Sequence, residues 1–227
     1  MKKTILTIIF SVGLCFSIFT TPISAKEYSI DSVNIQAFLN QNGSMKVTEE
    51  RRFNFQGDYR FAYQSINKQA QDRTEPYVLS DFKLCEKGTA VCYQALEKDQ
   101  VNFTEPRNNP DNTFVVEDRG NQYYLQWHFQ ANYEVKDFIL SYTVTNAITK
   151  HEDMAELYWQ FIGSAWEVAS QNIKATIFLP EQTLASQLDS IKAFLHGPLK
   201  ATVSISALPS QETQLHYVSL VAENLPV

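Results

Sequence analysis

Glycine is scarce in this chain, and its spacing excludes several classes of enzyme. Only 7 of the 227 residues are glycine. Phosphate-binding loops and dinucleotide-binding turns need glycines close to one another, because the backbone must approach the ligand closely. The nucleophile elbow of the usual α/β hydrolases needs a Gly-x-Ser-x-Gly segment, which is also missing. After the first 25 residues, the glycines stand alone at Gly43, Gly57, Gly88, Gly120, Gly163 and Gly197.

Histidine is also sparse, and its four positions are His128, His151, His196 and His216. They are too far apart for a linear zinc-binding motif. The densest group of metal-ligand types is His151-Glu152-Asp153, for which a charged turn between strands is the commoner explanation. We therefore predict no metal, no cofactor and no identifiable catalytic residue. A dispersed pair of carboxylates, as in glycosidases, stays open because such residues meet only in space.

A long apolar run occurs only at the N-terminus. Lys2 and Lys3 precede an uncharged apolar stretch from Ile5 to Phe19, and small residues follow up to Ala25. This order is typical of a secretory signal peptide. The run is shorter than the roughly 20 apolar residues that a membrane span needs, which disfavours an anchor. We predict a signal peptide at residues 1–25, cleavage after Ala25, and an extracytoplasmic domain at residues 26–227, either periplasmic, on the outer face of the cytoplasmic membrane, or secreted.

Cysteine is rare, and removal of the signal peptide leaves an even number. Cys15 lies in that peptide, so the domain keeps Cys85 and Cys92. An oxidising compartment favours a disulfide between them, and Lys87-Gly88 can turn the chain so that the two side chains meet across a small hairpin. A redox pair would usually have the tighter Cys-x-x-Cys spacing. We predict a local structural disulfide.

The domain carries an excess of acidic residues. The chain has 19 basic and 25 acidic residues, so loss of Lys2 and Lys3 leaves 17 − 25 = −8. This charge argues against nucleic acid and anionic membrane surfaces as main partners. No later segment is long and apolar enough for a transmembrane helix. Membrane attachment is therefore expected only through segments beyond residue 227, if the chain continues.

Alternation of apolar and polar residues is the dominant pattern after the signal peptide. Residues 28–39 and 45–55 alternate on either side of an Asn42-Gly43 turn, which predicts a hairpin. Glu49 and Arg51 interrupt the apolar side of the second strand, which predicts either a position at the sheet rim or an ion pair. Further alternating segments are Val78–Leu84, Tyr123–Phe129, Phe138–Val144, Ile173–Leu179, Thr202–Leu208 and Leu215–Val221.

Helical periodicity is almost absent. Only Glu181–Ser190, with Leu184 and Leu188 four residues apart, suggests a short helix. Residues 67–76 and 104–112 are polar and unpatterned, as in surface loops. The expected fold is mostly β: a single β-sandwich-like domain of antiparallel strands with one short helix.

The most unusual segment is the aromatic cluster at residues 157–166. Trp159 and Trp166 could line a groove for a sugar or a peptide. The alternative is burial, because alternation places Leu157, Trp159 and Phe161 on one face, as in a buried strand. The pattern favours core packing, and an interaction surface at the two tryptophans stays as the alternative.

The same segments carry a family resemblance. The resembling segments are 42–49 (NGSMKVTE), 53–57 (FNFQG), 140–147 (LSYTVTNA), 155–166 (AELYWQFIGSAW) and 196–199 (HGPL). In this order they resemble the N-terminal extracytoplasmic domain of a bacterial predicted membrane protein family, domain of unknown function 2207. The resemblance implies architecture rather than chemistry. Members of that family typically continue into transmembrane helices, whereas this chain ends at Val227, so a tethered ectodomain and a released variant are both open.

These observations favour a non-enzymatic extracytoplasmic module, the ectodomain of a membrane protein, that binds a protein or another cell-envelope component. One alternative is a carbohydrate-active or other cell-wall hydrolase built from dispersed carboxylates. Another is an envelope assembly or scaffolding protein, which an open edge strand would favour because such an edge can pair with a strand of another chain.

Overall fold

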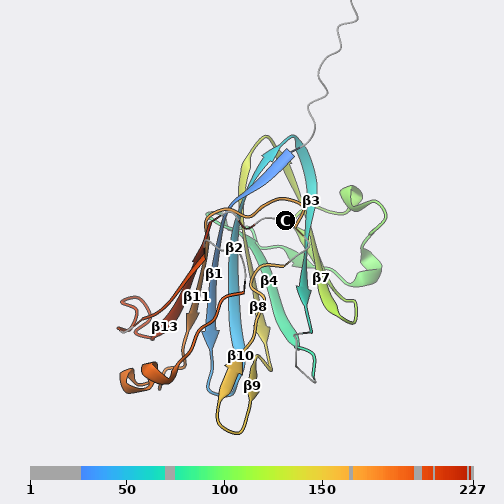
Figure 1. Ribbon diagram of the computed structural model, residues 1–227. Helices are drawn as coiled ribbons and strands as arrows, with labels where there is room; N and C mark the ends of the chain where they lie inside the picture. The colour runs from blue at the N-terminus through green and yellow to red at the C-terminus, as the bar shows by residue number, and fades with distance from the viewer. Residues whose placement is uncertain are drawn as a thin grey trace, which may run out of the picture.

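The computed structural model describes residues 27–69, 75–163, 166–196, 201–206, 208–223 and 225. The predicted signal peptide, its cleavage site at Ala25 and the segment Gly197-Pro198-Leu199 lie outside these residues. Strands are the main regular structure of the described chain (Figure 1). The expectation of a mostly β fold is therefore confirmed.

The strands form two large sheets and one small hairpin. The strands are β1 (Glu27–Leu39), β2 (Met45–Gln56), β3 (Asp58–Asn67), β4 (Leu79–Glu86), β5 (Gln94–Ala95), β6 (Thr113–Asp118), β7 (Gln122–Asn132), β8 (Val135–Val144), β9 (Ile148–Lys150), β10 (Ala155–Leu157), β11 (Ile173–Phe178), β12 (Ala201–Ile205) and β13 (Tyr217–Ala222). The seven-stranded sheet has the order β12-β13-β11-β1-β2-β8-β4, and the four-stranded sheet the order β3-β7-β6-β5. Strands β9 and β10 pair with each other.

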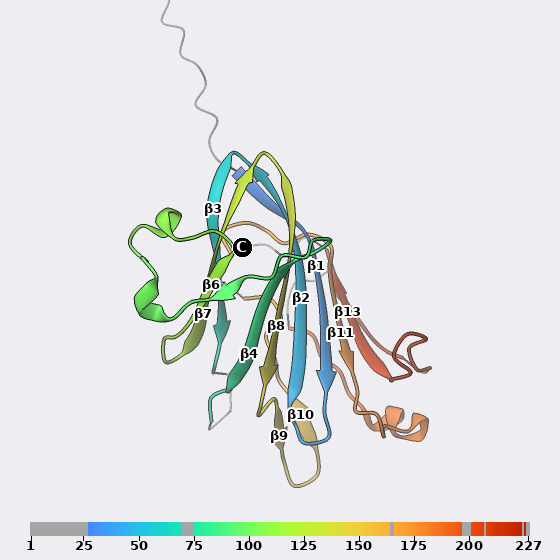
Figure 2. The same cartoon turned by 180° about the vertical axis from the view of Figure 1, so that it is seen from behind.

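The core lies between the sheets and is rich in aromatic rings. On β2, every second residue from Met45 to Phe55 is buried, as its alternation predicts. Phe53 packs edge-on against Trp127 of β7, with ring centroids 6.3 Å apart, and against Phe138 of β8 at 5.7 Å. Residues of both sheets therefore share one core. Figure 2 shows the seven-stranded sheet from the other side, with β4, β8, β2, β1, β11 and β13 side by side.

The predicted hairpin is present, but two strand pairings are parallel rather than antiparallel. Gly43 has φ +83°, a conformation that glycine adopts without strain, at the turn between β1 and β2. Strand β1 runs parallel to β11, from the pair Val33 and Ile173 to the pair Phe38 and Phe178. The whole four-stranded sheet lies between these two strands in sequence, so no tight turn constrains their relative direction. Strand β5 is also parallel to β6.

The predicted helix is shorter than expected and has a different geometry. It is the 3-10 helix η3 (Ala185–Ser190), and two further 3-10 helices are η1 (Lys98–Gln100) and η2 (Pro106–Asn108). Leu188 is buried, whereas Leu184 is 62% exposed and precedes the helix. An α-helix would place both leucines on one face, and here only one reaches the core. No helix in the described part of the chain has the length and apolar character of a membrane span.

Candidate functional site

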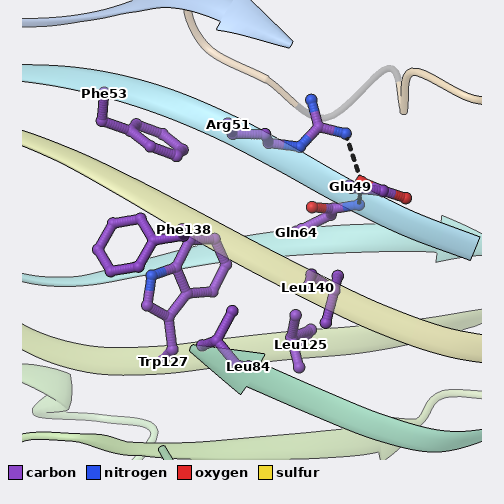
Figure 3. Close-up of a pocket in the computed structure, with 9 residues that line it drawn as sticks. All are labelled: Glu49, Arg51, Phe53, Gln64, Leu84, Leu125, Trp127, Phe138 and Leu140. Atoms are coloured by element: carbon purple, nitrogen blue, oxygen red, sulfur yellow. Dashed lines mark hydrogen bonds and ion pairs between the residues drawn. The ribbon is translucent and has the colours of Figure 1, made fainter. Parts of the chain in front are cut away.

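A buried polar cluster crosses the core between the two sheets. Glu49 and Arg51 face inward from β2 and form an ion pair, with Arg51 Nη2 2.7 Å from Glu49 Oε2. Gln64 of β3, in the opposite sheet, donates to the same oxygen at 2.9 Å. The Tyr142 hydroxyl of β8 donates to Glu49 Oε1 at 2.6 Å. The ion-pair alternative is thus the one that the structure adopts, and the pair lies in the interior rather than at the rim (Figure 3).

The surroundings of Glu49 leave no room for a substrate. Both carboxylate oxygens accept hydrogen bonds, and the residue is 2% exposed. The cavity that Glu49 and Arg51 line has a volume of about 10 Å³, enough for roughly one water molecule. Burial, followed by the charge of Glu49, raises the pKa of Tyr142 well above its ordinary value, so this hydroxyl keeps its proton. The cluster therefore links the sheets and holds the inward charge of Arg51.

Trp166 covers this cluster from outside the two sheets. Its ring centroid lies 5.0 Å from Arg51 Cζ and 5.8 Å from the ring centroid of Phe53. Trp166 is 8% exposed. A guanidinium above an indole ring forms a favourable cation–π contact. Trp166 is therefore a core residue that closes one end of the polar cluster.

Trp159 also packs inward, although its segment is not a strand. Strand β10 ends at Leu157, so the predicted buried strand through Phe161 is wrong. Trp159 is half-buried and stands edge-on to Tyr77, with ring centroids 4.8 Å apart and an interplanar angle of 72°. The structure thus brings Trp159 and Trp166 to the core, and they do not form an exposed aromatic groove. Alternation misled at this point because irregular chain that packs on a core has no fixed period.

The segment that carries both tryptophans lies along the edge strand β3. We call residues 158–163 together with 166–168 the strap. Asn67 donates to Gln160 Oε1 at 2.6 Å, and the Tyr63 hydroxyl donates to Glu167 Oε1 at 2.9 Å. A Cβ added to Gly163 would lie 2.9 Å from the carbonyl oxygen of Ser65. The strap therefore approaches β3 closely and covers this edge of the four-stranded sheet.

The predicted disulfide between Cys85 and Cys92 is present. The chain turns at Gly88, with φ +76°, and the Glu86 amide donates to the Val91 carbonyl at 2.9 Å. This is the small hairpin that the sequence predicts. A disulfide is typical of oxidising compartments outside the cytoplasm.

A second buried polar cluster surrounds His128 on β7, and sequence reasoning missed it. Asn109 and Gln126 direct their amide NH2 groups at His128 Nε2, at 3.1 and 2.9 Å. Nδ1 is 2.9 Å from the Thr113 hydroxyl, which donates to the Pro110 carbonyl at 2.6 Å. Two amide donors make Nε2 an acceptor, so Nδ1 carries the proton.

The His128 cluster anchors the polar segment at residues 104–112. Asn109 lies in that segment and is 7% exposed, while His128 is completely buried. Burial lowers the pKa of His128 to about 4, against an opposing effect of Asp111. The alternating pattern of β7 does not indicate which residues contact His128. Its partner Asn109 lies in a loop that is distant in sequence, so the cluster becomes visible only in the folded structure.

The segment His151-Glu152-Asp153, the densest group of possible metal ligands in the sequence, forms the charged turn that the sequence analysis favours. His151, Glu152 and Asp153 are exposed and lie between β9 and β10. His151 Nε2 is 3.3 Å from Glu156 Oε2 of the paired strand. The described residues contain no group of three or more histidine, cysteine, aspartate or glutamate side chains that could hold a metal ion.

The edges of the two sheets differ in how they are protected. The strap covers β3, and β5 is two residues long. Strand β4 is irregular at Asp81, which has φ +56°, and the Tyr93 amide donates to the Leu84 carbonyl at 2.8 Å, so the returning chain covers part of this edge. Among the described strands, β12 is paired with β13 alone. On its outer side, no strand of the described residues pairs with it, and we call this side the open edge.

Backbone geometry shows which groups of β12 face outward. The Ser206 amide donates to the Tyr217 carbonyl at 2.8 Å, at the end of the antiparallel pair of β12 and β13. Residues on an antiparallel strand bond to the same neighbour at every second position. Ser204 therefore also bonds toward β13, whereas the N–H and C=O groups of Val203 and Ile205 point to the open side. Val203 is 36% exposed, and the strand contains no charged residue.

Two facing sheets with a shared aromatic core define an all-β protein of sandwich-like architecture. The chain belongs to the family described as predicted membrane protein (DUF2207) N-terminal domain, whose model matches residues 29–217. This match confirms the family resemblance of the sequence. The matched region corresponds to the N-terminal domain of this predicted membrane-protein family. No curated protein matches the chain.

Several solved structures are similar in part. An M1 zinc metallopeptidase from Deinococcus radiodurans is 5% identical with a TM-score of 0.41, over 88% of this chain and 40% of that one. A candidate nutrient-binding protein from Legionella pneumophila is 11% identical with a TM-score of 0.43, over 88% and 63%. A candidate protease from Parabacteroides distasonis is 12% identical with a TM-score of 0.38, over 88% and 36%. This chain spans less than two thirds of each, and the scores are too low to transfer any property.

Proposed function

We propose that this domain is a non-enzymatic interaction module of the bacterial cell envelope, the ectodomain of a membrane protein, and that it binds a protein partner by strand addition at β12. The observation that carries the proposal is the open edge of β12. Its outward N–H and C=O groups at Val203 and Ile205 are complementary to the backbone of another extended segment.

The composition of β12 supports this role. Proteins usually protect exposed edges with charged residues, proline, irregular strands or covering chain. The edges at β3 and β4 have such protection in the strap and in the irregularity at Asp81. Strand β12 has the uncharged sequence Ala-Thr-Val-Ser-Ile. An edge that keeps its pairing groups available while other edges are covered is the arrangement that a strand-binding protein needs.

The compartment is part of the same proposal. Residues 1–25 direct export and are removed after Ala25, so that the domain faces the envelope outside the cytoplasm. The disulfide between Cys85 and Cys92 supports an oxidising location. Expression of the full chain in a bacterial host, followed by N-terminal sequencing of the exported form, tests this point. We expect the first residue to be Lys26, and an intact cytoplasmic chain would contradict it.

The β12 edge is tested by a variant that removes one outward amide. Val203→Pro deletes an N–H that points away from β13, so the ladder between β12 and β13 is kept while strand addition is blocked. Val203→Thr is the matched control, because it keeps the amide and a β-branched side chain. Both proteins are compared with the wild type by chemical crosslinking in cells and quantitative mass spectrometry, after thermal unfolding has established that both are folded.

The expected result is a specific protein that crosslinks to the wild type and to Val203→Thr, and whose recovery falls at least about tenfold with Val203→Pro. That protein is then purified and its binding to the three variants is measured directly. If folded Val203→Pro retains every partner of the wild type with unchanged affinity, binding through β12 is wrong.

A further inference from the structure

A row of aromatic rings on the seven-stranded sheet stops one strand before the open edge. Phe38, Phe178 and Tyr217 are aligned by cross-strand register on β1, β11 and β13. Phe38 and Phe178 are stacked with centroids 4.5 Å apart, and the centroid of Phe178 lies 6.1 Å from that of Tyr217. Figures 1 and 2 show β11 and β13 at the same margin of this sheet. Phe178 is buried and Tyr217 is half-buried, so Tyr217 is the accessible end of the row.

The next position of the row, directly after β12, is a serine. The Ser206 amide donates to the Tyr217 carbonyl at 2.8 Å, which makes the two residues direct cross-strand neighbours. Neighbours of this kind have their side chains on the same face of the sheet. A serine side chain is too small to continue a row of rings. The row therefore has a gap between Tyr217 and the place that a strand added at the open edge occupies.

The gap opens into a hollow of about 480 Å³. The residues that line it are uncharged: Ser206, Leu208, Pro209, Ser210, Gln211 and Tyr217. Leu208 is 74% exposed, so this wall presents apolar surface to solvent. A hollow bordered by an aromatic ring, a leucine and a proline, with a few neutral polar groups, suits an apolar side chain from another molecule.

The exposed lysines on this face of the sheet lie away from the hollow. Lys46 is on β2, three strands from Tyr217, and Lys174 is on β11, four residues from the partner of Tyr217. From the strand spacing and the rise per residue, each lysine backbone is roughly 14 Å from that of Tyr217. Glu212 follows the lining residue Gln211 in sequence, and its charge disfavours an acidic occupant.

We propose that the strand which adds to β12 carries an aromatic or large aliphatic side chain opposite Ser206, and that this side chain lies over Ser206 in the hollow and contacts Tyr217. The inference rests on the proposed function, because it needs an added strand at β12. Ser206 directs its amide toward β13, so it forms a non-hydrogen-bonded pair with the opposite residue of an antiparallel partner. The two Cα atoms of such a pair are only about 4.5 Å apart. Backbone pairing itself thus places the partner side chain beside the hollow.

The same pairing determines which other partner residues are apolar. Successive side chains of a strand point to opposite faces, so the partner residues opposite Ile205 and Val203 face the core side of the sheet. They are the first and third residues after the one opposite Ser206, because the partner is antiparallel. Ile205 is half-buried and Val203 is 36% exposed, and both present apolar surface there. The partner segment is therefore an aromatic or large aliphatic residue followed by apolar residues at the first and third positions after it.

Phage display of random seven-residue peptides on the purified exported chain tests the edge and the hollow together. Peptides enriched on the wild type are synthesised with a fluorescent label, and their affinities are measured by fluorescence polarisation. Each peptide is also made with alanine in place of its aromatic or large aliphatic residue. The protein variants are Val203→Pro for the edge and Tyr217→Ala for the hollow, with Tyr217→Phe as the matched control that keeps the ring. Circular dichroism and thermal unfolding establish that each variant is folded.

We expect the wild type to select peptides with the pattern given above. Alanine in the peptide should weaken binding to the wild type at least about threefold, and Tyr217→Ala should weaken binding of the original peptide about three- to tenfold. Tyr217→Phe should bind within about twofold of the wild type, because the ring is kept. The two losses should not add, because each change removes the same contact: Tyr217→Ala should bind the original and the alanine peptide with nearly equal affinity.

The two proposals fail in different ways. Peptides that bind folded Val203→Pro as tightly as the wild type contradict strand addition at β12, and so does a wild type that selects no peptide. The inference about the hollow then falls with it. If Val203→Pro abolishes binding but Tyr217→Ala and the alanine peptide leave the affinity unchanged, or if their losses add, strand addition holds and the contact with Tyr217 is wrong.

Discussion

Arg51 lies between a carboxylate and an aromatic ring, with Glu49 at 2.7 Å on one side and the centroid of Trp166 at 5.0 Å on the other. Both partners compensate a cation that is almost completely buried. Because Trp166 belongs to the strap and Glu49 to β2, this one side chain couples the strap to the sheet. The stability of the domain should therefore depend on Arg51 keeping both partners.

Glu49→Gln removes the charge that balances Arg51 while keeping the side-chain shape. An unpaired buried cation costs about 3–5 kcal/mol of unfolding free energy, and we expect a loss of this size in urea unfolding. Glu50→Gln is the matched control, since the adjacent Glu50 pairs with Lys87 at the surface, where such a pair contributes less than about 1 kcal/mol. Equal losses in the two variants would contradict the role of the buried pair.

Gly163→Ala tests the close approach of the strap to β3. The added Cβ would lie 2.9 Å from the backbone carbonyl oxygen of Ser65, which cannot rotate away as a side chain can. The strap must shift, and overpacking of this kind costs about 1–3 kcal/mol. Because Trp166 is a buried residue of the strap, its fluorescence should shift to longer wavelength as water gains access. Unchanged stability and emission would mean that the strap has free space at this point.

His128 should make the domain less stable in mild acid. Burial lowers its pKa to about 4 in the folded state, against about 6.5 when unfolded. Above pH 6.5 the histidine is neutral in both states, so its full contribution is present. As the pH falls from 6.5 to 4, only the unfolded state binds the proton, and about 3 kcal/mol of stability is lost.

The measurement is the unfolding free energy at several pH values between 4 and 7, for the wild type and for His128→Gln. We expect the slope in this window to be strongly reduced in the variant. The surface carboxylates with lowered pKa, Glu117 and Asp118, titrate below their ordinary values of about 4.5 and 3.8, so their effect falls mostly below this window. The same slope in both proteins would show that another group is responsible.

Strands are predictable from the sequence where one face is buried and the other is exposed to solvent. Strand β2 alternates cleanly, and its boundaries were predicted to within one residue. Strand β3 is not predicted from the sequence, because most of its side chains are half-buried and its pattern therefore has no clear period. The strand lies between the strap on one side and β7 on the other. The parallel pairing of β1 with β11 was missed because alternation carries no information on strand direction.

The interior sites were less predictable than the strands. Glu49 and Arg51 could be identified as anomalies on an apolar face, but Gln64 and Tyr142 reach them from other strands, and sequence spacing does not reveal such partners.

Loss of the disulfide should destabilise the domain without unfolding it. Cys85 and Cys92 close a loop of only a few residues, for which the chain-entropy estimate is about 2.5 kcal/mol. The double variant Cys85→Ser with Cys92→Ser should lose about this much in urea unfolding and keep the circular dichroism of a β protein, because the large core between the sheets lies elsewhere. Mass spectrometry of exported wild-type protein after alkylation, without reduction, should find no free thiol at either residue. Two alkylated cysteines in folded, exported protein would contradict the disulfide, and an unfolded double variant would mean that the hairpin at Gly88 contributes more to the fold than its local contacts indicate.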